Sequence, residues 1–309
     1  MSETGDQAFR ATSNNERWAE MTYGGALSFL RRRMTRELAG VDVVVSGVPN
    51  DASVTYRPGC RLGPRAIRAA SVQLAELKAF PFGFDPFETL SVVDWGDCMV
   101  DPHHPETVTP DIVDHARKII ATGAKMLTLG GDHYTSYPLL KAHAEKYGPV
   151  ALLQVDAHCD TWPDDPTRLD HGSMFGRAAA EGIIDVTKST QLGLRTYNDS
   201  DHGFDAAVKV IAERAGNTPL YISFDIDGLD PAFAPGTGTP VPGGLSSWQG
   251  LELIRALGPL NLIGMDVVEV SPPYDHAEIT ALAAAHIAHD WLCLLAAKAG
   301  AKPHAVGRL

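Results

Sequence analysis

The sequence predicts an α/β protein built on a mostly parallel sheet that is covered by helices on both sides. Short runs of β-branched and aliphatic residues alternate with longer stretches of helical periodicity along most of the 309 residues. The expected strands are also apolar on both faces, which is typical of strands buried between two helical layers.

The N-terminal third contains the first elements of this pattern. The polar segment Met1–Asn15 has no period and is expected to form a loose arm, followed by a helix over Leu27–Leu38. The first strand is expected over Asp42–Gly47, where β-branched residues stop at a glycine. A loop over Asn50–Gly63 follows, and a proline at its end is well placed to begin a helix over Pro64–Ala79.

The same alternation continues through the rest of the chain. The further expected strands are Leu90–Asp94, Lys125–Leu129, Ala151–Asp156, Gln191–Leu194, Leu220–Phe224 and Leu262–Val267. The further expected helices are Asp111–Ala121, Ser136–Tyr147, Phe175–Glu181, Phe204–Ala215, Trp248–Leu257 and Ile279–Lys298. No repeat or linker divides the chain, so we expect an arm and helix over residues 1–40 and one α/β domain over residues 41–309.

Composition excludes several classes of function. The balance of 26 basic against 38 acidic residues disfavours nucleic acid and anionic membranes as partners and favours a cationic ligand. The four cysteines have no paired spacing, which favours free thiols in a reducing compartment. The first residues are polar, so a secretory signal is not expected, and the apolar run over Ile279–Ala299 is interrupted by charged and histidine residues. We therefore expect a cytoplasmic protein.

Three clusters of potential metal ligands each follow an expected strand. Residues two apart in a strand point to the same side, and ligands of parallel sheets bind beyond the carboxyl ends of the strands. The clusters should therefore converge at one edge of the sheet. They supply six candidate ligands, which are His133, Asp156, His158, Asp160, Asp225 and Asp227.

The chemistry of this set indicates a pair of divalent ions. Four carboxylates in one place repel one another unless cations balance them, and two divalent ions would do so. A carboxylate-rich set with a minority of imidazole is typical of a Mn²⁺ site rather than of a zinc site built on thiolates. Shared carboxylates can hold two ions close together and activate a water molecule. The prediction is a hydrolytic centre with two divalent ions, for which Mn²⁺ is the favoured metal.

Each of these residues taken singly is more often a turn or structural residue than a ligand. The prediction depends on three clusters at equivalent strand ends. Cys159 alternates to the opposite side and is expected to pack, and Asp132 and Asp230 are expected to support ligands or cap turns.

The clusters resemble the signatures of a known family. Gly130–His133, Asp156–Asp160 and Ser223–Pro231 are similar to the three motifs of the ureohydrolases, the arginases and agmatinases that release urea from guanidino groups. The resemblance covers about residues 41–298 and extends through Ala232–Pro240 and Met265–Glu269. It implies a three-layer α/β/α fold with a central eight-stranded sheet, assembled as a homo-oligomer of three or six subunits.

The resemblance also implies roles for individual residues. His133 and Asp160 would hold one Mn²⁺, His158 and Asp227 the other, and Asp156 and Asp225 would bridge the two. We expect Asp160 to aim the attacking hydroxide as well. By the resemblance, Glu269 would pair with the guanidinium and His171 would pass a proton to the leaving amine.

Two loops are expected to select the substrate. Thr161–Leu169 lacks the polar pattern of arginases, and Asp170–Phe175 is similar to the D-H-G-[ST]-M-F segment of agmatinases. This favours agmatine, which would be cleaved to putrescine and urea. Asp164 or Asp165 would then attract the ammonium tail, unless both are ordinary surface acids. The Asn50–Gly63 loop, through Tyr56 and Arg57, and Trp162 are expected near the mouth of the site.

Other readings stay open from the sequence. A ureohydrolase acting on 4-guanidinobutyrate or 3-guanidinopropionate would need a basic partner for the acidic tail, which Arg57 or Arg168 could supply. A non-catalytic metal-binding regulator is a different class, and the complete ligand set together with His171 and Glu269 argues against it. A single-zinc deacetylase would not need so many carboxylates.

Overall fold

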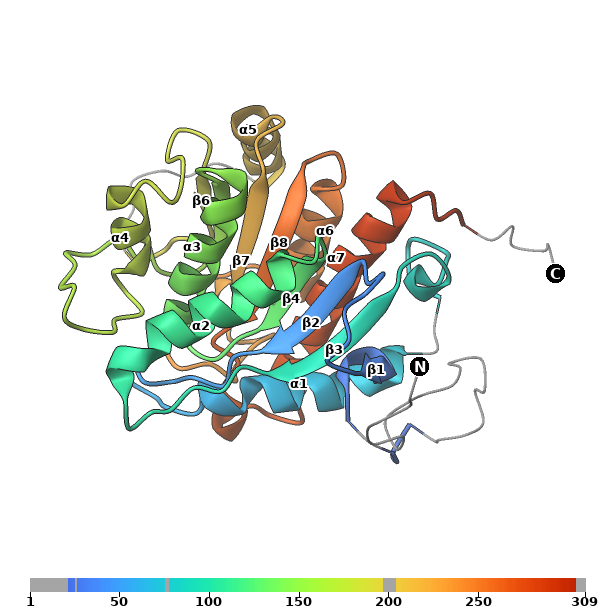
Figure 1. Ribbon diagram of the computed structural model, residues 1–309, viewed down its shortest axis with the longest axis horizontal. Coiled ribbons are helices and arrows are strands. Elements are labelled where there is room, and N and C mark those ends of the chain that lie inside the picture. Colours follow the sequence, from blue (N-terminus) through green and yellow to red (C-terminus); the bar gives the residue numbers. More distant parts are fainter. Residues whose placement is uncertain (1–21, 26, 76–77, 197–203, 304–309) are drawn as a thin grey trace.

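One eight-stranded sheet lies at the centre of the protein (Figure 1). The computed structural model describes residues 22–25, 27–75, 78–196 and 204–303, so the predicted arm over Met1–Asn15 lies outside the described residues. The strand order is β1-β3-β2-β4-β8-β7-β5-β6, and every neighbouring pair is parallel. The strands are β1 (Arg33–Met34), β2 (Val43–Gly47), β3 (Val92–Asp97), β4 (Lys125–Leu129), β5 (Ala151–Val155), β6 (Thr190–Leu192), β7 (Leu220–Asp225) and β8 (Leu262–Val268). The predicted fold class is confirmed.

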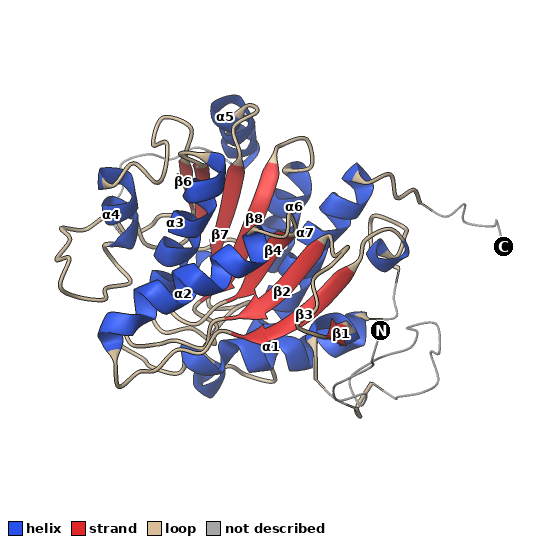
Figure 2. Ribbon diagram, in the orientation of Figure 1, coloured by secondary structure: helices blue, strands red, loops and turns tan. Residues whose placement is uncertain are grey.

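Helices cover both faces of this sheet (Figure 2). One face carries α2 (Pro105–Ile120), α3 (Ser136–Tyr147) and α4 (Met174–Ala180). The other carries α1 (Gly63–Ser71), α5 (Phe204–Ala215), α6 (Ser247–Ala256) and α7 (Ile279–Lys298). Neighbouring strand residues belong to opposite cores: Met126 packs with the first set and Leu127 with the second. This alternation produces strands that are apolar on both faces.

Each of the seven predicted strands overlaps an observed strand, and the eighth was missed. The prediction of a helix over Leu27–Leu38 is wrong, because this segment forms a short 3₁₀ turn followed by the edge strand β1. Leu30 has a positive φ of 51°, which interrupts a helix. The N–H groups of Phe29 and Leu30 donate instead to the side chains of Asp94 and Ser71, so tertiary hydrogen bonds replace helical ones.

Two predicted helices differ from the observed ones by more than one residue at an end. α1 ends at Ser71 and continues only as a 3₁₀ turn over Val72–Leu74, so it is shorter than the predicted Pro64–Ala79. α2 begins at Pro105, more than one helical turn before the predicted start at Asp111. A proline is tolerated there because the first helical position needs no N–H donor.

α7 is the longest helix in the described part of the chain, and its length and composition alone would suit a membrane span. However, 78% of its apolar window is buried inside the protein. α7 packs against α1 and α6, with Trp291 and Leu292 fully buried. Its apolar surface is therefore explained by this packing.

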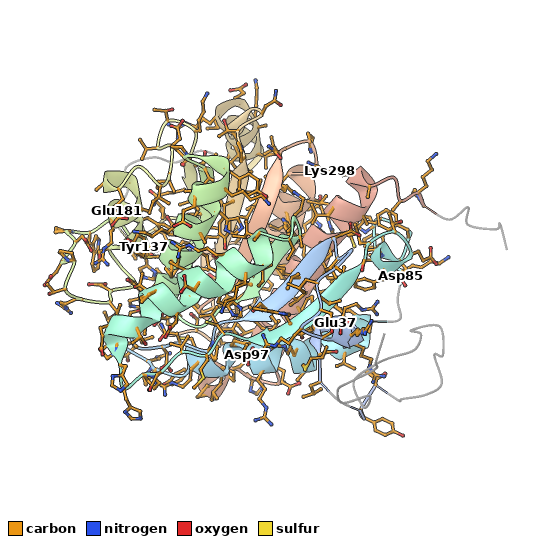
Figure 3. All side chains as sticks on the ribbon, in the orientation of Figure 1. Glu37, Asp85, Asp97, Tyr137, Glu181 and Lys298 are labelled. Carbon is orange, nitrogen blue, oxygen red and sulfur yellow. The ribbon has the colours of Figure 1, made fainter. Side chains whose placement is uncertain are left out.

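α4 is held against α3 at the side of the molecule that carries the Thr161–Leu169 loop. The Tyr137 hydroxyl donates to Glu181 Oε1 over 2.8 Å, and Figure 3 shows these two side chains together. Lys141 adds an ion pair to the same carboxylate at 2.9 Å. This docking holds the C-terminal end of α4, the helix that follows the loop.

Candidate metal centre and active site

The six predicted ligands meet at the carboxyl ends of three strands. His133 follows β4, while Asp156, His158 and Asp160 follow β5. Asp225 ends β7, and Asp227 lies in the 3₁₀ turn Ile226–Gly228 that comes next. Since β7 pairs with β5 and β8 separates β7 from β4, parallel strands bring all three clusters to one edge.

One group of ligands surrounds His133. Its Nδ1 lies 2.9 Å from Asp156 Oδ2, 2.8 Å from Asp160 Oδ2 and 3.2 Å from Asp225 Oδ2. The His133 side chain is only 1% exposed. Yet Nδ1 makes no hydrogen bond of acceptable geometry, although three carboxylates face it. A buried nitrogen that points among carboxylates in this way suits shared coordination of a cation.

A hydrogen bond at Nε2 of His133 fixes the ring so that Nδ1 faces the carboxylates. Ser223 Oγ donates to Asp266 Oδ1 over 2.8 Å, so it accepts the hydrogen bond from His133 Nε2, also at 2.8 Å. The proton therefore resides on Nε2, and Nδ1 presents its lone pair. Tyr221 donates to the other oxygen of Asp266 over 2.9 Å, which holds this carboxylate in place.

A second group of ligands lies beside the first and shares Asp156 with it. His158 Nδ1 lies 3.4 Å from Asp156 Oδ1 and 3.1 Å from Asp227 Oδ2. The donor atoms within each group, His133 with Asp156 and Asp160, and Asp156 with His158 and Asp227, lie within 4.8 Å of one another. Asp156 presents one oxygen to each group, as a bridging carboxylate would. The structure therefore contains a candidate metal-binding cluster with two adjoining parts.

Electrostatics of the cluster favours added positive charge. Burial raises the pKa of Asp160 to about 7, and repulsion from Asp156 adds to the rise. The pKa of Asp225 lies well above its ordinary value for the same reasons, burial first and then repulsion from Asp227. Burial opposes the charged form of His158, but the hydrogen bonds to its two carboxylate neighbours raise its pKa to about 11. Divalent cations would relieve this repulsion, which fits the donor set.

His171 and Glu269 form a pair next to the cluster. His171 Nδ1 lies 2.8 Å from Glu269 Oε1, and His171 Nε2 lies 2.9 Å from the Thr55 hydroxyl, which can accept its hydrogen bond. Burial lowers the pKa of His171, but the hydrogen bond and the charge of Glu269 outweigh it and raise the pKa to about 9. His171 therefore carries a proton at neutral pH.

Glu269 is held on both oxygens. Oε1 also accepts the His133 N–H at 2.9 Å, and Oε2 accepts the thiol of Cys60 at 3.1 Å. The carboxylate is 1% exposed and its residue has a φ of 63°, a strained backbone that its contacts maintain. Pairing with a guanidinium therefore requires His171 to release Oε1. Cys60, one of the four cysteines expected to be free thiols, is buried and in contact with this site.

A cavity of about 150 Å³ opens above the cluster. Its size suits a small substrate rather than a drug-sized ligand. The described residues that line it are Thr55, His133, His158, Asp160, Trp162, Asp170, His171, Gly172, Asp225 and Thr239. No Lys or Arg is among these described lining residues. A larger cavity of about 370 Å³ between α6 and α7 has one ionisable group, His286, among its described lining residues, so size does not mark the reactive site.

The residues predicted near the mouth of the site do not all lie at the cavity. Trp162 lines the cavity, whereas Arg57 lies over the rings of Tyr56 and Tyr274, 5.0 and 5.2 Å from the ring centroids. Arg168 is not among the described lining residues either.

The two loop acids expected near the substrate tail face elsewhere. Asp164 pairs with Arg177 at 2.7 Å, and this hydrogen bond lowers the pKa of Asp164. Asp165 accepts the N–H and hydroxyl of Thr167 at 2.9 and 2.7 Å. Neither is among the described residues that line the cavity, so these acids are held by their own loop and its helix.

Asp132 and Asp230 support the surrounding backbone as predicted. Asp132 is fully buried and accepts from the Asn50 side chain and the Ser53 N–H. Asp230 accepts backbone N–H groups, including those of Ala232 and Gly243.

Comparisons with known proteins place this geometry in a family. The model of the arginase family matches residues 41–293, which include all six clustered residues together with His171 and Glu269. The chain belongs to the arginase family. It is therefore a hydrolase of guanidino-type substrates, and the predicted resemblance is confirmed.

Individual family members are similar along nearly the whole chain. An agmatinase of Chromobacterium violaceum is 60% identical over 306 residues, which cover 94% of this chain and 95% of that protein. The crystal structure of a hypothetical agmatinase from Burkholderia thailandensis is 58% identical, with a TM-score of 0.88, over 90% of this chain and 92% of that one. The proclavaminate amidino hydrolase of Streptomyces clavuligerus is 36% identical, with a TM-score of 0.85, over 90% of this chain and 99% of that one.

Proposed function

We propose that this arginase-family chain is an agmatinase, a binuclear manganese hydrolase that cleaves agmatine to putrescine and urea. The observation that carries the proposal is the composition of the cavity. Predicted ligand residues line it, and its described lining contains carboxylates but no Lys or Arg. This environment attracts a molecule that is cationic at both ends. Relatives named agmatinase at 60% and 46% identity support the same substrate.

The donor set fits two Mn²⁺ ions. His133 and Asp160 would hold one, His158 and Asp227 the other, and Asp156 and Asp225 would bridge them. When bound, such ions lower the pKa of water and supply a hydroxide nucleophile near neutral pH.

The remaining steps belong to side chains of this protein. Asp160 lines the cavity and would accept a hydrogen bond from the nucleophile, which directs its lone pair toward the guanidinium carbon. Glu269 would bind the guanidinium N–H groups after the substrate displaces His171 from Oε1. The tetrahedral adduct formed by the attack then loses an amine.

His171 would supply the proton that the leaving amine needs. It lines the cavity, and its pKa of about 9 keeps it protonated at neutral pH. Proton transfer from a positioned imidazole is an ordinary form of general acid catalysis. Once displaced from Glu269, Nδ1 would be free to donate toward the substrate nitrogen.

An acidic substrate tail has less support. Neither Arg57 nor Arg168, the two residues that could bind such a tail, is among the described residues at the cavity. A 4-guanidinobutyrate or 3-guanidinopropionate carboxylate would instead meet Asp170 and the ligand carboxylates.

A panel of substrates tests the proposal. Purified protein loaded with Mn²⁺ is assayed for urea release from agmatine, arginine, 4-guanidinobutyrate and 3-guanidinopropionate at matched concentrations. The highest kcat/KM is expected for agmatine. A preference for either acidic compound would refute the substrate, and no turnover of any compound by protein that retains its metal would favour a non-catalytic regulator.

A further inference from the structure

We propose that Asp170 and Trp162 form the subsite that binds the cationic tail of the substrate. This inference rests on the proposed function, because it concerns the end of agmatine that does not react. It replaces the expectation that Asp164 or Asp165 attracts the tail, since both of those carboxylates have partners within their own loop and the adjoining helix.

Asp170 and Trp162 lie on two sides of the same glycine. The Trp162 N–H donates to the carbonyl oxygen of Gly172 over 3.1 Å, and the Gly172 N–H donates to Asp170 Oδ1 over 2.8 Å. A Cβ added at Gly172 would lie 3.4 Å from Asp170 Oδ1 and 3.5 Å from Trp162 Cε3. The carboxylate and the edge of the indole therefore approach each other across a residue that has no side chain.

Both side chains line the cavity that contains the ligand residues. His158 and Asp160 lie in the wall of this cavity together with Trp162 and Asp170. A substrate whose guanidinium carbon is attacked beside Asp160 would extend its tail within the same cavity. The tail would meet an aromatic ring and a carboxylate, which are the two groups that best recognise an ammonium ion.

Asp170 is available for such a contact. Its Oδ1 accepts one backbone N–H, and no described residue donates to its Oδ2. Trp162 is 56% exposed and lines the cavity, so its ring is open to a ligand. A neutral tail would gain only the apolar contact with the ring, and a carboxylate tail would be repelled by Asp170.

The test compares Asp170→Asn with Asp165→Asn. Asparagine keeps the oxygen that accepts the Gly172 N–H and removes only the charge. Asp165 is a neighbouring loop acid outside the described cavity lining, so its substitution is the matched control. Each variant is assayed with agmatine and with butylguanidine, which has the same guanidinium group and no ammonium.

For Asp170→Asn we expect kcat/KM for agmatine to fall roughly ten- to hundredfold, as for the loss of a hydrogen bond to a charged group. The value for butylguanidine should stay near that of the wild type, as should both values for Asp165→Asn. Equal losses with both substrates would show that Asp170 acts on His171 or the loop, and would overturn the proposal. An unchanged kcat/KM for agmatine in Asp170→Asn would also overturn it.

Trp162→Leu provides an independent arm if Asp170→Asn does not fold. Leucine keeps apolar contact but removes the ring face, so KM for agmatine should rise with little change for butylguanidine, and Trp162→Phe should restore part of the loss. A rise that is equal for both substrates would contradict a cation-binding role. The wild-type assay alone tests the proposed function. Hydrolysis of butylguanidine without hydrolysis of agmatine would refute it, whatever the variants show.

Discussion

Substitution of Ser223 tests how the buried network controls metal affinity. Ser223→Ala removes the hydroxyl between His133 Nε2 and Asp266 Oδ1, two contacts of 2.8 Å each. Both partners are fully buried, so each loses a hydrogen bond that water does not readily replace. A buried group left unpaired costs about 1–3 kcal/mol, and about 1.4 kcal/mol is a tenfold change in binding.

We therefore expect Ser223→Ala to bind Mn²⁺ roughly 10- to 100-fold more weakly, the range typical of residues that orient a histidine ligand. Competition with a chromophoric chelator measures this affinity directly. Ser136→Ala is the matched control, because Ser136 Oγ contacts Ser223 Oγ at 3.0 Å and the Asp266 carboxylate but does not touch His133 Nε2. Its loss should stay below about threefold. Unchanged affinity in Ser223→Ala, or equal losses in the two variants, would refute the reasoning.

Three further predictions address ligands, proton transfer and stability. Asp225→Asn should abolish both Mn²⁺ retention and turnover, measured by elemental analysis and urea release; full activity would overturn its role as a ligand. His171→Phe should retain metal but lower kcat roughly 10²- to 10⁴-fold. Since the hydrogen bond to Glu269 keeps His171 of the free enzyme protonated up to about pH 9, wild-type kcat/KM should decline above that pH, and this decline should be absent from the residual activity of the variant. Arg68→Met should cost about 3–5 kcal/mol in urea unfolding, because it leaves Asp94 buried without the guanidinium that contacts it at 2.8 Å. Asp94→Asn removes the charge and keeps an oxygen that can accept the Phe29 N–H; if adding it to that variant restores no stability, the buried charge is not the cause.

The sequence predicted the ligand cluster because its signal is local. D-x-H-x-D and D-x-D place side chains on one side of a strand end, and the parallel topology brings strand ends together whatever the loops do. The strands themselves were recognisable from apolar runs such as Ala151–Val155, which are buried on both faces.

The remaining features depend on contacts between distant parts of the chain. Cys60 reaches Glu269 across 209 residues, and Phe29 reaches Asp94 across 65. No periodicity near Phe29 shows that a side chain elsewhere will take its N–H, so a helix was predicted there. The loop acids could not be assigned from the sequence for the same reason. Asp164 is paired with Arg177 on α4, a contact that the loop sequence does not reveal.

In the proposed mechanism, guanidino hydrolysis requires two ions bound in one cluster. The most direct measurement is urea release from agmatine by metal-free protein titrated with Mn²⁺, with bound metal counted at each point. Activity is expected to rise to a plateau at two Mn²⁺ per chain, because His133 and His158 belong to separate groups that share Asp156. A plateau at one ion, or full activity in protein freed of metal, would contradict it.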